Sequence, residues 1–298
     1  MRKAIVIAIA AVSLVSAACA PSSSSSSAEA SGTYDTAAAC AQAHAGDLYQ
    51  AGNLTIATGN PAYKPWYGGG SVPNSDWKAG QYTGDPHSGE GYEGAFAYAL
   101  AAKLGFTNDQ VQWLGIPFNK SFAPGPKDYD FAMQQISISE KRAEAVDFSS
   151  GYFDVNQALI ANNGSPAIGV TTLAGLKDLT LGAPLGTTSL QVIQEEVQPS
   201  VEPKVYPTLD LALKAMNNGD VDGVVVDLPT AFYGYADTVV GQFPNLGGQQ
   251  EQLGLAFSKG NAFVPCVDQA IQELKAEGTL DQLKTTWLET KAKVPTFS

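Results

Sequence analysis

The 298-residue sequence contains only three cysteines and two histidines, and basic residues are the minority among its charged ones. His44 and His87 lie far apart along the chain, and no pair of cysteines has metal-binding spacing, so neither a metal nor another cofactor is expected. Aspartate and glutamate number 29 against 17 lysines and arginines, which gives a formal charge of −12. Such a surface repels phosphate backbones, and nucleic acid is therefore not an expected partner.

The apolar run at residues 4–15 is too short to span a membrane. It follows two basic residues and precedes small ones, which is the order typical of an export signal, here at residues 1–18. The small residues before Cys19 resemble the lipobox of bacterial lipoproteins, although Ser16 stands where leucine is usual. The resemblance implies that Cys19 anchors an exported chain by lipid to the outer face of the cell membrane. Ordinary secretion is the alternative.

Residues 22–27 are all serine, and small or polar residues continue the segment to residue 33. A segment of this composition cannot bury a core. We therefore expect residues 19–50 to form a lipid-anchored flexible tether and N-terminal extension.

Two cysteines, Cys40 and Cys266, remain once Cys19 is assigned to the lipid. Disulfides persist in exported proteins, so we predict a bridge between these two. Cys266 begins a strongly helical stretch at residues 266–288, and the bridge would tie this stretch to the start of the folded part.

The rest of the chain is long enough for two domains. Apolar runs at residues 179–183 and 221–227 have the pattern of buried strands, and the segments at 189–197 and 209–217 have helical periodicity. Alternating strands and helices predict an α/β fold in which helices cover a parallel sheet.

Arg142 stands in an unfavourable place for a cation. Residues 137–148 have the pattern of a short strand that turns into a helix, and Ser139 is the expected N-cap. Arg142 then occupies the first turn, where backbone N–H groups and the helix dipole already present positive charge. A role in holding an anion would explain this position. The alternative is a surface ion pair with an acidic residue of the same segment.

Two further groups follow predicted strands. Thr187 and Thr188 come before a helix, and a capping box from Thr188 to Gln191 places the helix N-terminus there. Asp227 ends an apolar strand, where ligands gather in open α/β sheets. The alternative for the two threonines and for Asp227 is that they serve only as helix caps. Together with Arg142, they form a recognition set for the carboxylate and the ammonium of a free amino acid.

The order of these groups resembles a known family, the extracellular solute-binding proteins (family 3 type) of bacterial ABC importers for polar amino acids. The resemblance extends from about residue 54 to residue 288. The motifs that carry it are Ser137-Ile-Ser139-Glu-Lys-Arg142, Val146-Asp-Phe-Ser149, Gly186-Thr187-Thr188 and Val226-Asp227.

The resemblance implies a two-lobe periplasmic-binding-protein fold of type II, in which each lobe is a sheet flanked by helices. Two crossover strands join the lobes, which close over the ligand by a hinge motion. We place lobe I at residues 51–157 and 256–298, and lobe II at residues 158–255.

The resemblance also assigns roles to individual residues. Arg142 would clamp the α-carboxylate with help from Thr187 and Thr188. Asp227 would take the α-ammonium together with the carbonyl of Ser137.

Aromatic and amide side chains would form the rest of the site. Tyr63 and Trp66 match the aromatic position after the first strand and would pack on the aliphatic part of the ligand, with loop packing as the alternative. Phe118 is the candidate for a second aromatic wall. Gln134 and Gln135 replace the small residues of many members, so a long amide is expected to enter the pocket.

The implied function is to bind a free polar amino acid without chemistry on it, and to deliver it as a monomer to the permease subunits of an ABC importer. The segments at 68–91 and 117–126 depart from the family pattern, so the side-chain specificity does not carry over. One alternative is a cyclohexadienyl-dehydratase-like enzyme, for which Glu90 and Glu93 are the candidate acids. The other is a ligand-sensing module for a receptor.

Overall fold

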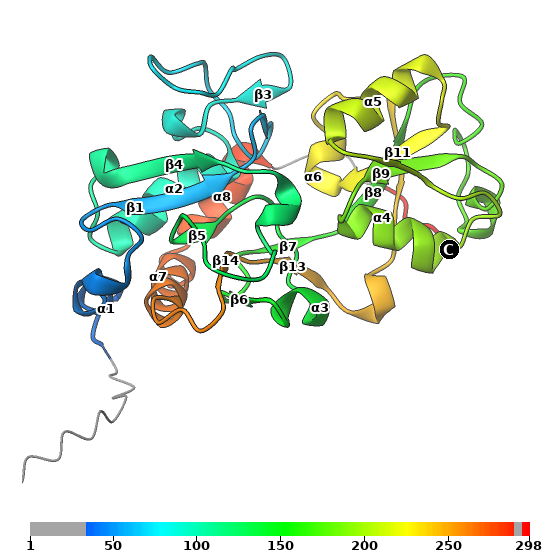
Figure 1. Ribbon diagram of the computed structural model, residues 1–298. Coiled ribbons are helices and arrows are strands. Elements are labelled where there is room, and N and C mark those ends of the chain that lie inside the picture. Colours follow the sequence, from blue (N-terminus) through cyan, green and yellow to red (C-terminus); the bar gives the residue numbers. More distant parts are fainter. Residues whose placement is uncertain (1–33, 289–293) are drawn as a thin grey trace, which may run out of the picture. The chain divides into compact units, whose positions relative to one another are not determined.

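The computed structural model describes residues 34–288 and 294–298, where the chain forms two α/β lobes (Figure 1). The expected export signal at 1–18, Cys19 and the serine tether lie outside the described residues. In the described part, no helix combines the length and the apolar character that a membrane crossing needs.

The sheet of lobe I has the strand order β4-β1-β5-β14-β6. Its strands are β1 (Leu54–Thr58), β4 (Val111–Gly115), β5 (Phe131–Ala132), β6 (Val146–Phe148) and β14 (Ala256–Ser258). β1 runs parallel to β4 and β5, whereas β14 is antiparallel to β5 and β6. The carboxyl ends of β1, β4 and β5 therefore meet at one edge of the sheet.

Helices from both ends of the described chain cover one face of this sheet. They are α1 (Ala37–Ala43), α2 (Tyr92–Lys103), α7 (Val264–Ala276) and α8 (Thr279–Trp287). Leu54 and Ile56 of β1 are buried in the core that these helices form. The strongly helical stretch at 266–288 forms two helices, because Gly278 adopts a positive φ of 74° and separates α7 from α8.

The sheet of lobe II has the strand order β10-β9-β11-β8-β12. Its strands are β8 (Gln157–Ala161), β9 (Leu181–Pro184), β10 (Lys204–Tyr206), β11 (Gly223–Asp227) and β12 (Thr238–Gln242). β9, β10 and β11 are parallel, so their carboxyl ends also lie together.

Helices α4 (Thr188–Val192) and α5 (Leu209–Asn218) lie on opposite faces of the lobe II sheet (Figure 1). Leu159 of β8 is buried in the core with α4, and Ile160 is buried in the core with α5. Successive side chains of a strand point to opposite faces, so a strand covered on both sides needs a continuous apolar run.

Shorter elements complete the chain. These are β2 (Ala62–Tyr63), β3 (Thr83–Gly84), α3 (Glu140–Ala143), α6 (Leu228–Ala231), the 3₁₀ turns η1 (Ala45–Asp47), η2 (Pro86–Ser88), η3 (Asn108–Gln110), η4 (Phe118–Lys120), η5 (Ala174–Leu176) and η7 (Leu246–Gly248), and the π-helical turn η6 (Ile193–Val197).

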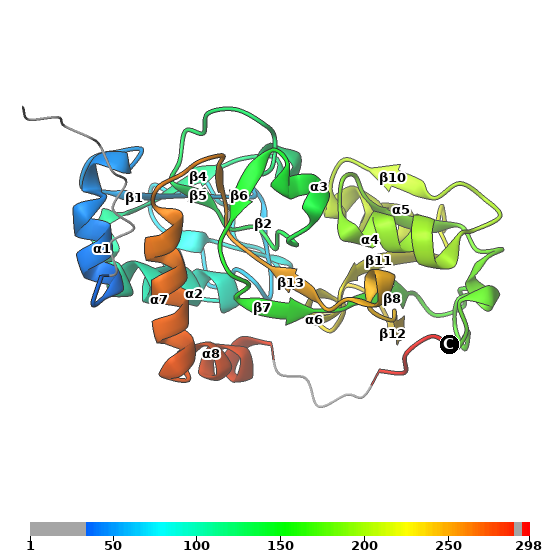
Figure 2. The same cartoon turned by 90° about the horizontal axis from the view of Figure 1, so that it is seen from below.

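Two antiparallel strands, β7 (Phe153–Val155) and β13 (Glu251–Leu253), connect the lobes and pair with each other (Figure 2). The extended residues 152–161 form two strands divided at Asn156, because β7 pairs with β13 whereas β8 joins the sheet of lobe II. The chain thus crosses between the lobes twice, as the sequence predicts.

The last residues depart from the expected lobe boundaries. Residues 294–298 pack on lobe II, although the sequence placed the whole segment 256–298 in lobe I. The backbone N–H of Phe297 donates to the carbonyl of Gln242 at 2.9 Å, and the ring of Phe297 lies 5.0 Å from that of Phe243. Burial of this aromatic ring explains why the segment lies there.

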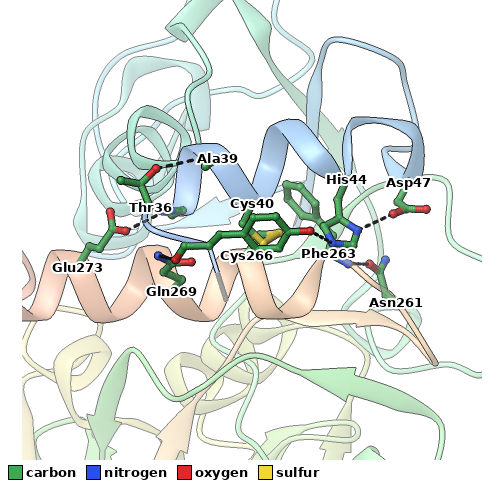
Figure 3. Close-up of a disulfide and its surroundings, with 12 residues drawn as sticks. Thr36, Ala39, Cys40, His44, Asp47, Asn261, Phe263, Cys266, Gln269 and Glu273 are labelled. Carbon is green, nitrogen blue, oxygen red and sulfur yellow. Dashed lines mark hydrogen bonds and ion pairs between the residues drawn. A yellow bond between two sulfur atoms is a disulfide. The ribbon is translucent and has the colours of Figure 1, made fainter. Parts of the chain in front are cut away.

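The predicted disulfide between Cys40 and Cys266 is confirmed (Figure 3). It joins α1 to α7 across 226 residues, with a Cα–Cα distance of 5.2 Å. The backbone N–H of Ala37 also donates to Glu273 at 2.8 Å. The N-terminal extension, which the predicted boundaries separate from lobe I up to residue 50, thus packs on lobe I from α1 onward.

His44 lies close to both sulfurs, and this trio is the one cluster with metal-ligand spacing in residues 34–288 and 294–298. Both sulfurs are bonded in the disulfide, and the His44 ring contacts Asp47 at 2.9 Å instead.

Replacing Cys40 and Cys266 together by serine is expected to lower the free energy of unfolding by roughly 2–5 kcal/mol, because the unfolded chain loses a covalent constraint. Urea denaturation would measure the loss, and reduced wild-type protein should match the double variant. Equal urea midpoints for the variant and the oxidised wild type would show that the bridge adds no stability.

Candidate ligand-binding site

A cavity of about 370 Å³ lies where the strand ends of the two lobes face each other. Lobe I contributes the segments that follow β1, β4 and β5, and lobe II contributes those that follow β9, β10 and β11. The lining residues are Gly59, Asn60, Pro61, Tyr63, Trp66, Ile116, Pro117, Phe118, Asn119, Gln134, Gln135, Pro184, Leu185, Thr187, Thr188, Ser189, Pro207, Thr208, Leu209, Val225, Val226, Asp227 and Thr230. Carboxyl ends of strands are the usual place for ligands in α/β sheets.

Asp227 ends β11 and lines the cavity. It precedes α6, but its side chain makes no capping hydrogen bond there, so capping is not the role of the carboxylate. Instead, Asp227 accepts a hydrogen bond from the side-chain amide of Gln157 at 2.7 Å. The same nitrogen lies 3.2 Å from the carboxylate of Glu251, so one amide bridges two acidic side chains.

Burial raises the pKa of Asp227 to about 7, and the nearby charge of Glu251 raises it further. The hydrogen bond from Gln157 and the charge of Arg142 act in the opposite direction. A cation placed beside Asp227 would stabilise its ionised form.

Arg142 lies in the first turn of α3, and the predicted N-cap is confirmed because Ser139 Oγ accepts from the Arg142 backbone N–H at 3.3 Å. The side chain is buried rather than paired on the surface. Its Nη1 donates to the carbonyl of Ser137 at 2.6 Å, and its Nη2 donates to the carbonyl of Gly186 at 2.9 Å. Because Gly186 belongs to lobe II, the guanidinium links the two lobes.

Two aromatic rings pack on this guanidinium. Its central carbon lies 4.5 Å from the ring centre of Phe122 and 5.5 Å from that of Phe118. Phe118 lines the cavity, whereas Arg142 is placed behind the lining. Burial lowers the pKa of Arg142 to about 10, so the side chain stays positively charged at neutral pH.

Thr187, not Thr188, is the N-cap of α4. Its hydroxyl accepts from the backbone N–H of Leu190 at 3.2 Å and donates to the carbonyl of Pro184 at 2.8 Å. The N-cap is thus one residue earlier than predicted, and the predicted capping box from Thr188 to Gln191 does not form, because Thr188 is already in the helix and Leu190 stands at the third helical position. This leaves the Thr188 hydroxyl at the cavity, 3.2 Å from Ser137 Oγ.

Ser137 connects the hinge to both lobes. Its hydroxyl donates to Glu251 at 2.5 Å, and its carbonyl accepts from Arg142. The carbonyl that the resemblance assigns to the ammonium is therefore already bound to the guanidinium. A carbonyl oxygen has a second lone pair, so it can still accept from a ligand.

Tyr63 and Trp66 both line the cavity. Trp66 is buried, and its indole N–H donates to the hydroxyl of Thr230 in lobe II at 2.8 Å. The two lobes are thus in direct contact beside the cavity.

Both glutamines after β5 line the cavity, but their amides have different surroundings. The backbone N–H of Gln135 donates to Glu93 at 2.8 Å, and its side-chain amide donates to the same carboxylate. Gln134 accepts from the hydroxyl of Ser121 at 3.3 Å. Gln134 therefore makes fewer hydrogen bonds to the protein than Gln135 does.

The two segments that depart from the family pattern have different neighbours. Residues 117–119 line the cavity, as expected for a segment that shapes specificity. Tyr82, in the segment 68–91, instead stacks on Tyr235 of lobe II at 4.7 Å. The hydroxyl of Tyr235 donates to the carbonyls of Lys64 and Tyr82 at 2.7 and 3.1 Å. The segment 68–91 thus contributes to a contact between the lobes.

Three polar residues of this region were not among the predicted site residues: Gln157, Glu251 and Glu93. The sequence contains one indication of Gln157, because this residue is polar and stands at the start of an apolar strand. The sequence contains no such indication of Glu251, because its position depends on the pairing of β13 with β7. Glu93 was considered only as a catalytic acid.

Glu93 is fully buried in the first turn of α2 and also accepts from the hydroxyl of Tyr152. Burial raises the pKa of Glu93 to about 7, although its hydrogen bonds act in the opposite direction. The folded protein therefore holds this proton more tightly than the unfolded chain does.

The contribution of Glu93 to stability is consequently full below its unfolded pKa of 4.5 and is lost as the pH rises through 7. We expect this group to remove roughly 3 kcal/mol of stability between pH 4.5 and pH 8. Urea denaturation at both pH values should show a smaller loss for Glu93→Gln than for wild type. The exposed Glu90→Gln is the matched control. Equal pH dependence in wild type and Glu93→Gln would contradict the expectation.

Comparison with known proteins gives both a family and a fold. Residues 74–290 match the family model of the bacterial extracellular solute-binding proteins, family 3. The ABC transporter glutamine-binding protein of Bacillus subtilis (strain 168) is 28% identical over 164 residues, which are 54% of this chain and 59% of that protein. The L-cystine-binding protein of Escherichia coli (strain K12) is 27% identical over 215 residues, which are 69% of this chain and 77% of that protein.

Among solved structures, an ancestral amino acid-binding protein described as a precursor of cyclohexadienyl dehydratase is similar in fold. The TM-score is 0.61 at 26% identity, and the match covers 80% of this chain and 96% of that one. The predicted two-lobe α/β periplasmic-binding-protein fold is thereby confirmed.

Proposed function

Because this chain belongs to the bacterial extracellular solute-binding proteins, family 3, we propose that its cavity binds a free amino acid and that the protein delivers it to an ABC importer. The relatives are named as binding proteins for amino acids, which supports a function without catalysis. Delivery requires the permease subunits of the importer as partners, and a monomer is sufficient for this role.

The observation that carries the proposal is the placement of an anion, Asp227, in the lining of the cavity between the lobes and of a cation, Arg142, behind that lining. The carboxylate of Asp227 lines the cavity and would receive the ligand ammonium. Arg142 uses Nη1 and Nη2 for protein carbonyls, but a guanidinium has five N–H groups. The remaining N–H groups, with Thr187 and Thr188, would hold the ligand carboxylate.

Ligand binding would favour the closed arrangement of the lobes. The contacts from Trp66 to Thr230 and from Arg142 to Gly186 already join lobe I to lobe II. A ligand that touches both walls adds binding energy only when the lobes are closed, so it shifts the population toward that state. For this motion we take residues 34–156 and 256–288 as lobe I, and residues 157–255 with 294–298 as lobe II.

A thermal-shift screen of the twenty amino acids tests the proposal. A ligand at 1,000 times its Kd stabilises the folded state by about 4 kcal/mol through mass action, which raises the melting temperature by several degrees. We expect such a shift for at least one polar amino acid. If none of the twenty raises the melting temperature, the proposed function is wrong.

We further propose that the mature protein is a lipoprotein held at the outer face of the cell membrane through Cys19. The support is the sequence alone, namely the small residues before Cys19 and the serine-rich segment after it. Labelling with a fatty-acid analogue should mark the wild-type protein but not Cys19→Ala. Equal labelling of both would contradict the anchor.

A sensory role would differ from transport only in the partner. Crosslinking in membranes should capture permease subunits of an ABC importer. Capture of a receptor without any permease would favour the sensory alternative.

A further inference from the structure

The wall that lobe I contributes to the cavity is polar but uncharged. Its hydrogen-bonding side chains include Asn60 after β1, Asn119 after β4 and Gln134 after β5. Asp227 of lobe II is the single lining residue with a formal charge in the described part of the chain.

The other charged groups near the site already have protein partners or are solvated. Glu93 binds Gln135, Glu251 binds Ser137, and Arg142 binds two backbone carbonyls. Asp210 is near Tyr63 but is exposed to solvent. A charged ligand side chain against lobe I would therefore lose part of its hydration without gaining an ion pair, which is unfavourable.

The amides of Asn60 and Gln134 offer complementary groups to a neutral polar side chain. Asn60 Nδ2 donates to the carbonyl of Asp76 at 3.3 Å, which leaves Oδ1 as an acceptor. Gln134 Oε1 accepts from Ser121, and within the described residues its Nε2 has no hydrogen-bond acceptor.

The side-chain amide of Gln134 lies close to the backbone that precedes Asn60. A Cβ atom added to Gly59 would be 2.6 Å from Gln134 Nε2, so Gln134 reaches the backbone next to Asn60. A terminal carboxamide matches this pair, because its NH₂ can donate to Asn60 Oδ1 while its oxygen accepts from Gln134 Nε2.

We propose that the site selects an amino acid with an uncharged, hydrogen-bonding side chain, with Asn60 and Gln134 as the residues that read a terminal carboxamide. The inference rests on the proposed function, because it takes the ligand to be an amino acid held at Asp227 and Arg142. It assigns the side-chain end of the ligand to lobe I.

Isothermal titration calorimetry of the full chain with six L-amino acids tests the proposal. Glutamine or asparagine should bind about tenfold or more tightly than methionine, because each neutral hydrogen bond adds up to about a tenfold gain. Glutamate, arginine and lysine should bind at least about 100-fold more weakly than the better carboxamide, because a buried charge would be unpaired.

A charged amino acid that binds as tightly as the carboxamides would overturn the inference while supporting the proposed function. The same holds if methionine binds as tightly as the better carboxamide. If none of the six binds but another of the twenty amino acids does, the inference fails and the proposed function stands. If none of the twenty binds, the proposed function itself fails.

Gln134→Glu provides a second, independent test. The new carboxylate can still accept from Ser121, and it places a negative charge on the lobe I wall. Affinity for arginine or lysine should rise about tenfold or more, and affinity for glutamine should fall. The exposed Gln282→Glu adds the same charge away from the cavity and should change neither. An unchanged ligand preference in Gln134→Glu would show that Gln134 does not contact the side chain.

Discussion

Arg142→Ala is expected to abolish measurable amino-acid binding while the two lobes stay folded. Removal of one partner from a buried, hydrogen-bonded charge pair costs roughly 2–5 kcal/mol, which is a loss of about 30-fold to 5,000-fold in affinity. The substitution also removes the donor that links the Ser137 carbonyl to that of Gly186 in lobe II. Calorimetry would measure the affinity, and circular dichroism would verify the fold.

Arg142→Lys separates charge from geometry. Lysine keeps the positive charge, but its ammonium cannot reproduce the planar fork that reaches two carbonyls and a ligand carboxylate together. It also stacks less well on the rings of Phe118 and Phe122. We expect Arg142→Lys to bind nearly as weakly as Arg142→Ala. Affinity close to wild type in either variant would contradict the assigned role.

The exposed Lys259→Ala serves as the control for loss of a cation. Lys259 pairs with Asp147 at 2.8 Å on the surface of lobe I, and exposed pairs contribute little to stability. This variant should bind the ligand with wild-type affinity.

Asp227→Asn is expected to reduce affinity by a similar factor, because a neutral amide cannot balance the ligand ammonium. Asparagine has the shape of aspartate and can still accept from the amide of Gln157, so the local structure should be retained. The exposed Asp109→Asn is the matched control and should bind normally. Calorimetry that finds equal affinities for Asp227→Asn and wild type would refute the role of Asp227.

The pH dependence gives Asp227 a further signature. Its pKa is raised to about 7 without ligand, so the group is largely protonated at pH 6. A bound ammonium favours the ionised carboxylate, so binding at pH 6 should release a proton. Affinity should therefore rise with pH up to about 7 and then level off.

Calorimetry in buffers of different ionisation enthalpy would detect the released proton. Asp227→Asn should show neither the proton release nor this rise in affinity. The unliganded variant should also be more stable than wild type at pH 8. The pKa of Asp227 is higher in the folded protein than in the unfolded chain, so ionisation of this group at high pH destabilises the folded state. Identical proton release in both proteins would assign the titration to another group.

Local sequence rules predicted much of the site. Ser139 was recognised as a cap, and the unfavourable position of Arg142 marked it as a residue with a special role. Asp227 was placed at a strand end, beside the cavity, because its apolar strand was evident. The error at Thr187 and Thr188 is of one residue, since both threonines can cap a helix and only the backbone decides between them.

The parts that sequence rules missed depend on contacts between distant segments. Gln157 and Glu251 meet because β7 and β13 pair at the hinge, and they are 94 residues apart. The packing of residues 294–298 on lobe II was missed because the chain leaves lobe I after α8. Neither contact has a local signature.

The sequence by itself determined the α/β class and the disulfide partners, and it supplied the groups that we propose to recognise an amino acid. Hydrophobic periodicity, cysteine pairing and helix-end chemistry are local properties or involve very few candidates. Only the tertiary structure decided which polar groups meet at and behind the cavity, because strand order brings Gln134 to the backbone beside Asn60 and the charge of Glu251 near Asp227. The environment of each carboxyl group, and hence its pKa, also follows from this packing, because burial and neighbouring charge determine it.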